Sequence, residues 1–449
     1  MESSMAIRPG DLPAAPQPLP TAPGALAEVM QNAPQPPAEQ KASTSYIWFQ
    51  VLGQFGVFVA FITPLAISLA IRLAELAPGR DEYLGYITGA GSLVVMVTAP
   101  LLGVLSDRTR SRIGRRRPFM IGGMLVGILS LFVMAMAPSA LVLGIGWVLA
   151  QLGWGQVLQA LLTSMADKLS ETQRGKVAGL AGFATQVAPV VGVVIAGSFA
   201  ADALLLFLLP GLVGVIFVTL FVLFTKENDT RNARFDEKLS LGTLFSKYLY
   251  NPRSYPDFSW VWLGRFLFYF GLTLNTTFTA FFFAERLGVS VADSAPIIAT
   301  ISLIGIVATT AGAIGGGFLS DKLRRRRVFV LYSGVLFTLG TVVMAVASDF
   351  TLLVTGSMIV SAGIGMFSAI DQALILDVLP EKDTNAGRFM GIIGFAVSIP
   401  QAVAPFIAPA FLAIGVVAGG EKNYTLLYLI AGVFTLIGGM VAMRVRSVR

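Results

Sequence analysis

The chain has 449 residues, of which 55% are hydrophobic and only 13% are charged, and its net charge is +7. That charged fraction is about half of what an average soluble protein carries, so most of the surface is expected to face lipid or neighbouring helices. The sequence has no cysteine, which excludes disulfides and thiol chemistry, and no histidine, which removes the usual proton carrier at neutral pH.

Residues 1–45 differ in composition from the rest of the chain. They are rich in proline, alanine and glutamine, and they contain no apolar run long enough for the core of a signal peptide. Such a segment cannot bury enough surface to offset the entropy lost on ordering. We therefore expect a disordered, Pro-rich tail.

Apolar segments follow one another through the remainder of the chain. Each has about the 20 residues that a helix needs to cross a hydrocarbon core of ~30 Å. Because there are twelve segments, both chain termini are expected on the same side of the membrane. We place the segments at residues 46–73, 84–105, 118–138, 140–165, 177–201, 203–225, 259–284, 295–318, 328–348, 351–378, 389–415 and 424–443.

The Lys and Arg residues are distributed unequally between the two sides. Of the 32, only Arg72, Arg80, Arg286 and Lys422 fall in loops on the side away from the termini, and Arg265 lies inside a span. Cytoplasmic loops are the ones enriched in Lys and Arg, so the termini are expected in the cytoplasm and the protein in the plasma (inner) membrane. The positive charge then reflects topology and gives no reason to expect a nucleic-acid partner.

The second half of the chain repeats motifs of the first half. "GVLSDRTRSRIGRRRPF" follows the second span and "GFLSDKLRRRRVF" follows the eighth, and Asp167 after span 4 corresponds to Asp377 after span 10. Two similar halves joined by a polar loop are typical of transporters. The expected parts are a disordered cytoplasmic tail (1–45), an N-terminal six-helix bundle (46–225), a central cytoplasmic loop (226–258), a C-terminal six-helix bundle (259–443) and a cytoplasmic C-terminal tail (444–449).

The duplicated motif G-x-x-x-D-R/K, followed by a basic cluster, resembles the signature of the major facilitator superfamily. The form "SDRTRSRIGRRRPF", with "GQFG" (Gly53–Gly56) and "TPL" (Thr63–Leu65) in span 1, resembles the sucrose-transporter branch and the glycoside–pentoside–hexuronide:cation symporters. The resemblance implies an all-α membrane protein with 12 transmembrane helices in two pseudo-symmetric six-helix bundles. One departure is that this branch has a charged residue partway along span 4, where this chain is uncharged until Asp167.

The same resemblance implies a cytoplasmic gate made of Asp107, Arg108 and Arg115, with Asp321 and Lys322 as the counterparts in the second half. An ionised Asp at the end of a helix can accept hydrogen bonds from arginines and from the N-terminus of a facing helix. The helix-dipole part of this interaction is worth ~0.3–2 kcal/mol, which biases a conformational equilibrium without locking it. The alternative is that the basic residues only fix topology.

Two charged residues lie inside spans, where each costs about 2.5–3.5 kcal/mol on insertion scales. Arg265 and Asp371 both lie about six residues, or ~9 Å, from the cytoplasmic ends of spans 7 and 10. In the superfamily fold, spans 1, 4, 7 and 10 line the central cavity, so we expect these two side chains to pair there and to handle substrate or protons. The alternative is a static ion pair that helps two helices to insert.

Neutral polar and aromatic residues on the same spans could bind a solute, because sugars are held by hydrogen-bonding groups and aromatic faces. The alternative for each is a hydrogen bond between helices. The candidates are Gln50, Gln54, Gln151, Trp154, Gln159, Tyr269, Asn275 and Ser368.

The expected function is secondary active transport of a small polar solute, a sugar or glycoside, by alternating access and proton-coupled symport. One alternative is a drug or metabolite:proton antiporter, which the Phe-rich "TTFTAFFFAERL" of span 7 would suit; another is a non-transporting receptor or scaffold. We expect no enzyme activity, no metal and no cofactor. The expected partners are a sugar-like solute, protons and the lipid bilayer, and the expected state is a monomer.

Overall fold

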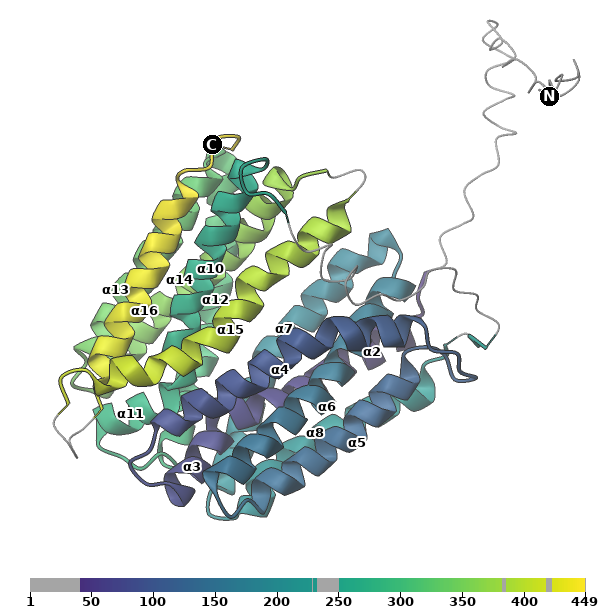
Figure 1. The fold of residues 1–449 in the computed structure, drawn as a ribbon, viewed down its shortest axis with the longest axis horizontal. Helices are drawn as coiled ribbons and strands as arrows, with labels where there is room; N and C mark the ends of the chain where they lie inside the picture. The colour runs from purple at the N-terminus through teal and green to yellow at the C-terminus, as the bar shows by residue number, and fades with distance from the viewer. Residues whose placement is uncertain (1–40, 228, 232–249, 382–384, 417–421, 449) are drawn as a thin grey trace, which may run out of the picture. The chain divides into compact units, whose positions relative to one another are not determined.

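The computed structural model describes residues 41–227, 229–231, 250–381, 385–416 and 422–448. Most of the predicted disordered tail (1–45) and the middle of the predicted central loop (226–258) lie outside these residues. The helices are α2 (Thr44–Thr63), a π-helical turn (Pro64–Ser68), α3 (Leu69–Leu76), α4 (Glu82–Asp107), α5 (Arg117–Ala135), α6 (Ala140–Lys168), α7 (Glu171–Ser198), α8 (Ala203–Phe224), α10 (Pro256–Thr277), α11 (Thr279–Leu287), α12 (Ser294–Leu323), α13 (Arg326–Ala345), α14 (Phe350–Val378), α15 (Ala386–Ala413) and α16 (Tyr424–Ala442) (Figure 1).

Twelve membrane spans can be traced through the described residues. Eleven helical stretches are long and apolar enough to cross a membrane, and the twelfth is the pair α10 and α11, which is bent by 51° at Phe278. The first span passes through the π-helical turn because Pro64 has no N–H to donate; the wider turn is closed by the Leu69 N–H, which bonds to the Pro64 carbonyl. The all-helical fold predicted from the sequence is confirmed.

Helices α2 to α8 form one bundle, the N half, and helices α10 to α16 form a second, the C half. Corresponding helices pack in the same way: α5 lies against α6 as α13 lies against α14, and α2 lies against α8 as α10 lies against α16. A similar side-chain contact also occurs in each half. Arg72 donates a hydrogen bond of 3.0 Å to the Ala137 carbonyl in the N half, and Arg286 donates one of 2.7 Å to the Ala345 carbonyl in the C half. The duplication read from the sequence is therefore present in the packing.

The two ends of the bundles differ in charge. We call one the arginine-rich face; it carries residues 108–116 and 324–325, together with residues 42 and 448 near the ends of the described chain. The opposite face carries the connections at residues 77–81, 136–139, 199–202, 288–293 and 346–349.

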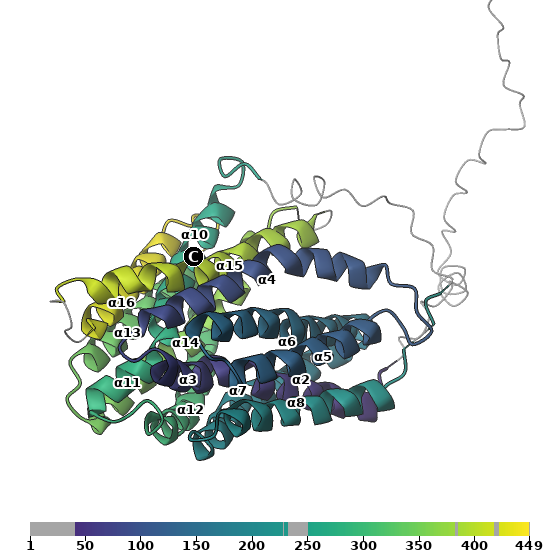
Figure 2. The same cartoon turned by 60° about the horizontal axis from the view of Figure 1, so that its bottom comes forward.

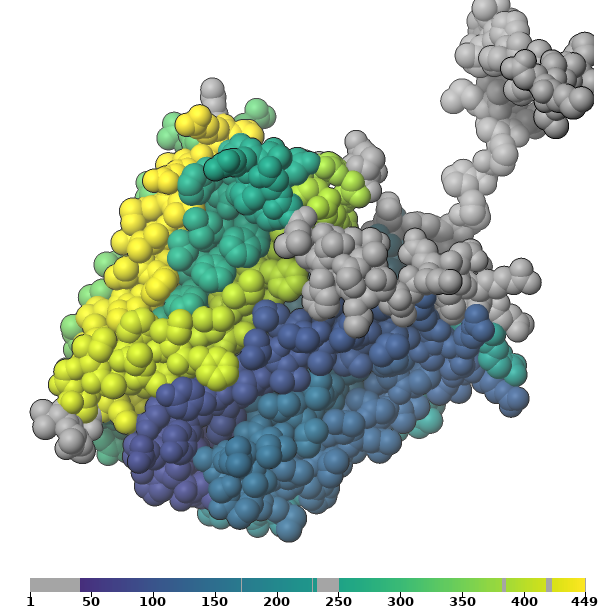
Figure 3. Space-filling model, in the orientation of Figure 1, coloured from purple at the N-terminus to yellow at the C-terminus, as the bar shows by residue number. Residues whose placement is uncertain are grey.

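The two halves meet through α4 with α15 and through α7 with α12 (Figures 1 and 2). Near the opposite face, α4 and α15 are so close that a Cβ atom on Gly85 would lie 2.3 Å from the Pro405 carbonyl oxygen, so only glycine fits there. The rings of Tyr86 and Phe406 lie 6.3 Å apart across the same seam. In the space-filling view the atoms of α4 and α15 touch along it (Figure 3). Contacts near the opposite face therefore hold the halves together.

Candidate functional site

Arg265 on α10 and Asp371 on α14 form an ion pair inside the C half. Asp371 is only 4% exposed, and the Arg265 side chain is 13% exposed. The Arg265 guanidinium also lies 5.2 Å from the ring centre of Tyr269, one turn further along α10, at a distance typical of a cation–π contact. The two charges contact each other, as their similar depth predicts, but they do so inside the C half, and their role in handling solute or protons stays a prediction.

Aromatic stacking brings α10 and α14 together beside this ion pair. The rings of Phe268 and Phe367 stack with their centres 3.5 Å apart, and both side chains are buried. On its other side, α10 packs closely against α16: a Cβ atom on Gly264 would lie only 2.9 Å from the Gly438 carbonyl oxygen. The helix that carries Arg265 is thus fixed on both flanks, which holds the charge pair in place.

A buried ion pair is costly to form and more costly to break. Each ion loses several kcal/mol of hydration, which the partner and further hydrogen bonds must offset. Among the described residues, the Nε atom of Arg265 has no hydrogen-bond partner, so one donor remains available beside the pair. The ion pair thus leaves one buried N–H donor of Arg265 unsatisfied.

Several predicted polar residues are accessible on the spans. Gln159 on α6 and Ser368 on α14 are exposed, and Gln151 and Tyr269 are half-buried. An exposed amide within a membrane span would lack hydrogen-bond partners in lipid, so such side chains require water, protein or a polar solute. These four residues remain candidates for solute contact.

Three other candidates occupy the interior of the N half. The Gln50 amide donates a hydrogen bond of 2.8 Å to the Leu161 carbonyl, and the Gln54 amide lies 3.7 Å from the Met165 sulfur. Both bonds join α2 to α6, which is the interhelical alternative given above. Trp154 is fully buried, and its ring fills the space beside Gly127 on α5. The prediction that Trp154 offers a stacking surface to a solute is therefore wrong. Because Gly127 has no side chain, the Trp154 ring packs against its backbone inside the N half.

Asn275 on α10 is 6% exposed, and its Nδ2 atom has no hydrogen-bond partner among the described residues. A buried amide without a partner is uncommon and costs free energy. Asn275 lies near the bend between α10 and α11, three residues before Phe278. It therefore has a donor available for a ligand at that bend.

The duplicated acidic residues at the arginine-rich face lie in two matching clusters. In the N-half cluster, Arg116 contacts Asp107 at 2.6 Å and Asp167 at 3.3 Å, and Arg115 contacts Asp167 at 2.8 Å. In the C-half cluster, Arg326 contacts Asp321 at 3.3 Å and Asp377 at 2.6 Å. Arg116, Asp107 and Asp167 correspond to Arg326, Asp321 and Asp377, whereas Arg115 has no counterpart among the described ion pairs of the C half. Each cluster lies within its own half.

These clusters differ from the predicted gate in which basic residues they use. The side chain that holds Asp107 is Arg116, which is 5% exposed, and neither Arg108 nor Arg115 contacts Asp107 in the described ion pairs. Lys322 is likewise not a member of the C-half cluster. The signal that could have identified Arg116 is its position immediately before α5, which Arg326 repeats as the first residue of α13.

The opposite face carries a set of contacts that the sequence did not reveal. Glu82 forms an ion pair of 2.9 Å with Lys422, and the Tyr424 hydroxyl donates a hydrogen bond of 2.7 Å to Asp81. Burial raises the pKa of the Asp81 carboxyl above its ordinary value of 3.8, against the lowering effects of Tyr424 and Lys422. We call these four residues the opposite-face latch, because they join the N half to the C half.

The geometry agrees with a comparison to known families. The profile described as "Major Facilitator Superfamily" matches residues 44–315 and 306–449. The chain belongs to the Major Facilitator Superfamily. This is a family of membrane transporters and not of enzymes, as the sequence motifs predicted.

Individual relatives match over short segments. A "General alpha-glucoside permease" of Schizosaccharomyces pombe is 42% identical over 85 residues, which cover 19% of this chain and 14% of the permease. A "Probable inositol transporter 2" of Arabidopsis thaliana is 33% identical over 108 residues, which cover 24% of this chain and 18% of the transporter. The matched segments thus span less than a fifth of either relative.

Solved structures of this superfamily share the fold. The crystal structure of the nucleoside transporter NupG has a TM-score of 0.69 and 14% sequence identity, and the match covers 90% of this chain and 99% of that one. The "partially occluded inward open conformation" of the xylose transporter XylE from E. coli has a TM-score of 0.61 and 13% identity, over 88% and 97% of the two chains. At this identity the likeness concerns the fold alone.

Proposed function

We propose that this protein is a secondary active transporter that moves a sugar or glycoside across the plasma (inner) membrane by alternating access, coupled to protons. The observation that carries the proposal is the ion pair between Arg265 and Asp371, each of which lies inside a membrane span. A charge pair in this setting is expensive, and such pairs mark ion and substrate pathways in membrane proteins. The protein acts as a monomer with its termini in the cytoplasm.

The contacts between the halves support alternating access. The opposite-face latch and the close approach at Gly85 join the halves near one face, whereas the two arginine clusters each stay within one half. By the distribution of Lys and Arg, the arginine-rich face is cytoplasmic. This conformation then corresponds to an inward-open state, and the other state forms when the latch opens and the arginine-rich face closes.

Coupling is proposed to take place at Asp371. In the resting state, Asp371 is ionised and paired with Arg265. A solute hydroxyl that accepts a hydrogen bond from Arg265 weakens its hold on the carboxylate, and the carboxylate, left in a buried site, then takes up a proton. Solute and proton are released on the other side when the ion pair reforms.

The nature of the solute is proposed from the polar side chains available. Gln151, Gln159, Tyr269 and Ser368 offer amide, hydroxyl and aromatic groups but no charge, which suits a neutral polyhydroxylated solute. The alpha-glucoside permease and inositol transporter among the relatives support the same class.

The alternative of an exporter of apolar compounds rested on the phenylalanines of span 7. In the structure, Phe278, Phe281, Phe282 and Phe283 are all buried, and Phe282 stacks on Tyr428 at 3.8 Å. These rings form the core of the C half beside α16 and offer no surface to a cargo. The observation favours the sugar transporter.

Uptake by proteoliposomes tests the proposal. The purified chain is reconstituted and offered a panel of labelled disaccharides and polyols, with and without an inward proton gradient, and a parallel set is loaded with lipophilic dyes. Accumulation of one sugar that depends on the gradient supports the proposal. Gradient-driven dye extrusion without sugar uptake would establish the exporter, and transport of neither would remove the proposal.

A further inference from the structure

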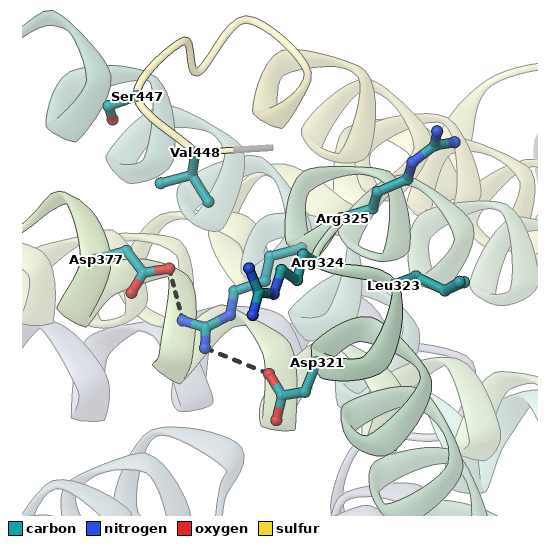
Figure 4. Close-up of a pocket in the computed structure, with 8 residues that line it drawn as sticks. Asp321, Leu323, Arg324, Arg325, Asp377, Ser447 and Val448 are labelled. Atoms are coloured by element: carbon teal, nitrogen blue, oxygen red, sulfur yellow. Dashed lines mark hydrogen bonds and ion pairs between the residues drawn. The ribbon is translucent and has the colours of Figure 1, made fainter.

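A concave site lies at the arginine-rich face, where α12 and α14 end and α13 begins. It is a cavity of about 1080 Å³ next to the turn between α12 and α13. Arg326 forms ion pairs with Asp321 and Asp377, which are the dashed lines in Figure 4, and the Arg325 side chain extends away from both carboxylates. The lining residues are Asp321, Leu323, Arg324, Arg325, Arg326, Asp377, Ser447 and Val448.

The charges around this cavity are not balanced within the described residues. Arg326 pairs with both Asp321 and Asp377, which are the two acidic residues of the lining. Arg324 and Arg325 are exposed, and neither forms an ion pair with a described residue. The lining therefore has three guanidinium groups and two carboxylates. Both carboxylates are already paired with Arg326, so Arg324 and Arg325 have no carboxylate of their own among the described residues of the lining.

Arg324 also adopts a backbone conformation that is unfavourable for residues other than glycine. Its φ of 50° and ψ of 43° are left-handed, at the C-cap of α12, where glycine is the usual choice. A side chain retained at such a position carries a conformational cost. The presence of arginine here, in place of glycine, is explained if the Arg324 side chain is needed at the cavity.

The corresponding turn of the N half shows what a balanced version contains. There, Glu227 from the segment after α8 reaches the loop between α4 and α5, and its carboxylate accepts a hydrogen bond of 3.1 Å from the Arg116 backbone N–H. A Cβ atom on Gly114 would lie 2.1 Å from the same carboxylate, so the acid is packed directly onto the basic loop. The chain itself thus supplies an anion to the arginine-rich turn of the N half.

The C half lacks this acid. Glu227 lies three residues beyond the end of α8, and the residue three beyond the end of α16 is Val445. Its carbonyl accepts a hydrogen bond of 2.7 Å from Arg327, but its side chain is apolar, and the described residues that follow, 446–448, include no acid.

The tail that replaces the acid is held in a fixed position. Asp257 at the start of α10 accepts hydrogen bonds from the backbone N–H groups of Arg446, at 3.0 Å, and Ser447, at 2.8 Å. The wall of the cavity formed by Ser447 and Val448 is therefore anchored, and the cavity lies where the N half has its carboxylate.

We propose that this cavity binds a phosphate group, which supplies the negative charge that Glu227 supplies in the N half. Guanidinium groups bind phosphate oxygens through paired N–H donors, and the first N–H groups of α13 add partial positive charge at the same turn. The cavity lies beside the end of a membrane span, so both a lipid headgroup and a soluble phosphate can reach it. The site is separate from the proposed sugar pathway and does not depend on it.

A fluorescence titration tests the proposal, because the chain has no native cysteine. Ser447→Cys, in the cavity wall, carries an environment-sensitive dye in the full-length reconstituted protein. One arm compares vesicles of phosphatidylcholine with vesicles that also contain phosphatidic acid. The other arm adds inorganic phosphate to phosphatidylcholine vesicles. A saturable response to phosphatidic acid alone assigns the site to a lipid headgroup, and a response to inorganic phosphate assigns it to soluble phosphates.

Two substitutions with matched controls decide whether the response comes from the cavity. Arg324→Gln removes a cavity cation and Val448→Glu adds a carboxylate to the wall, and each is expected to raise the half-saturating concentration about tenfold. Arg112→Gln, an exposed arginine of the N-half loop, and Val448→Gln are expected to change it by less than about twofold. The absence of a saturable response in both arms, or equal losses in Arg324→Gln and Arg112→Gln, would overturn the proposal.

Discussion

Glu82 at the start of α4 and Lys422 just before α16 form an ion pair of 2.9 Å that ties the N half to the C half. Both side chains are largely shielded, at 16% and 26% exposure. A pair of this kind contributes ~0.2–1 kcal/mol. That is enough to shift a nearly balanced equilibrium severalfold, and too little to prevent the halves from separating.

Lys422→Gln should therefore open the opposite face more often. Ala402 is buried on α15, and its carbonyl oxygen would lie 3.1 Å from a Cβ atom on Gly89 of α4, so a thiol at position 402 reacts only when this seam opens. We expect Lys422→Gln to raise the rate of maleimide labelling of Ala402→Cys by about two- to fivefold. Glu75→Gln is the control, because it breaks the 2.7 Å ion pair with Arg72 within one half. Equal rates in Lys422→Gln and in the control would show that the latch does not govern opening.

Gly85→Ala should prevent this close approach of the halves. The new methyl group would meet the Pro405 carbonyl oxygen at 2.3 Å, and such overpacking costs about 1–3 kcal/mol in this conformation alone. Spin labels at Glu75→Cys and Val289→Cys, both on the opposite face, should report longer distances in Gly85→Ala. Gly103→Ala on the same helix is the control, since nothing lies within 4 Å of its Cβ position. An unchanged distance distribution in Gly85→Ala would contradict the described seam.

The latch should respond to pH through Asp81. Burial raises the pKa of this carboxyl above 3.8 when the halves are joined, so its protonated form favours the joined state. Joining is thus most favourable at low pH and weakens as the pH rises through the raised pKa. Between about pH 7 and about pH 4, the spin-label distances should shorten as the pH falls. Asp81→Asn should remove this shortening at low pH, and a variant that still shortens would assign the titration to another group.

The two arginine clusters should differ in their contribution to stability. The Arg116 side chain is 5% exposed, whereas Arg326 is 27% exposed. Arg116→Gln leaves Asp107 without its ion-pair partner and removes the 3.1 Å hydrogen bond to the buried Ser106 hydroxyl, while Asp167 keeps Arg115. We therefore expect Arg116→Gln to cost about 1–3 kcal/mol and Arg326→Gln about 1 kcal/mol or less. Thermal unfolding in detergent measures the difference. Equal losses would mean that burial does not set the strength of these clusters.

The sequence was sufficient for the spans, the duplication and the Arg265–Asp371 pair. Hydropathy and charge act locally, and the depth of a residue within a helix follows from counting residues. Two opposite charges at equal depth on spans that pack together have few other ways to be satisfied.

The residues that the sequence misassigned depend on features that counting does not reveal. Trp154 lies at the predicted depth, but which way it points is set by the space beside Gly127 on another helix. The choice of Arg116 over Arg115 as the partner of Asp107 depends on the path of the loop before α5. The latch could not be found because its members are far apart in sequence, although Lys422 is one of few basic residues on its side.

Accumulation of labelled sugar by Asp371→Asn proteoliposomes is the most direct test of proton coupling. A gradient of about one pH unit supports about tenfold accumulation when one proton accompanies each solute. We expect wild type, and the control Asp202→Asn at the start of α8, to reach this level. Asp371→Asn should still exchange sugar across the membrane but should accumulate none above equilibrium. Accumulation by Asp371→Asn equal to that of wild type would contradict the proposed role of the Arg265–Asp371 pair.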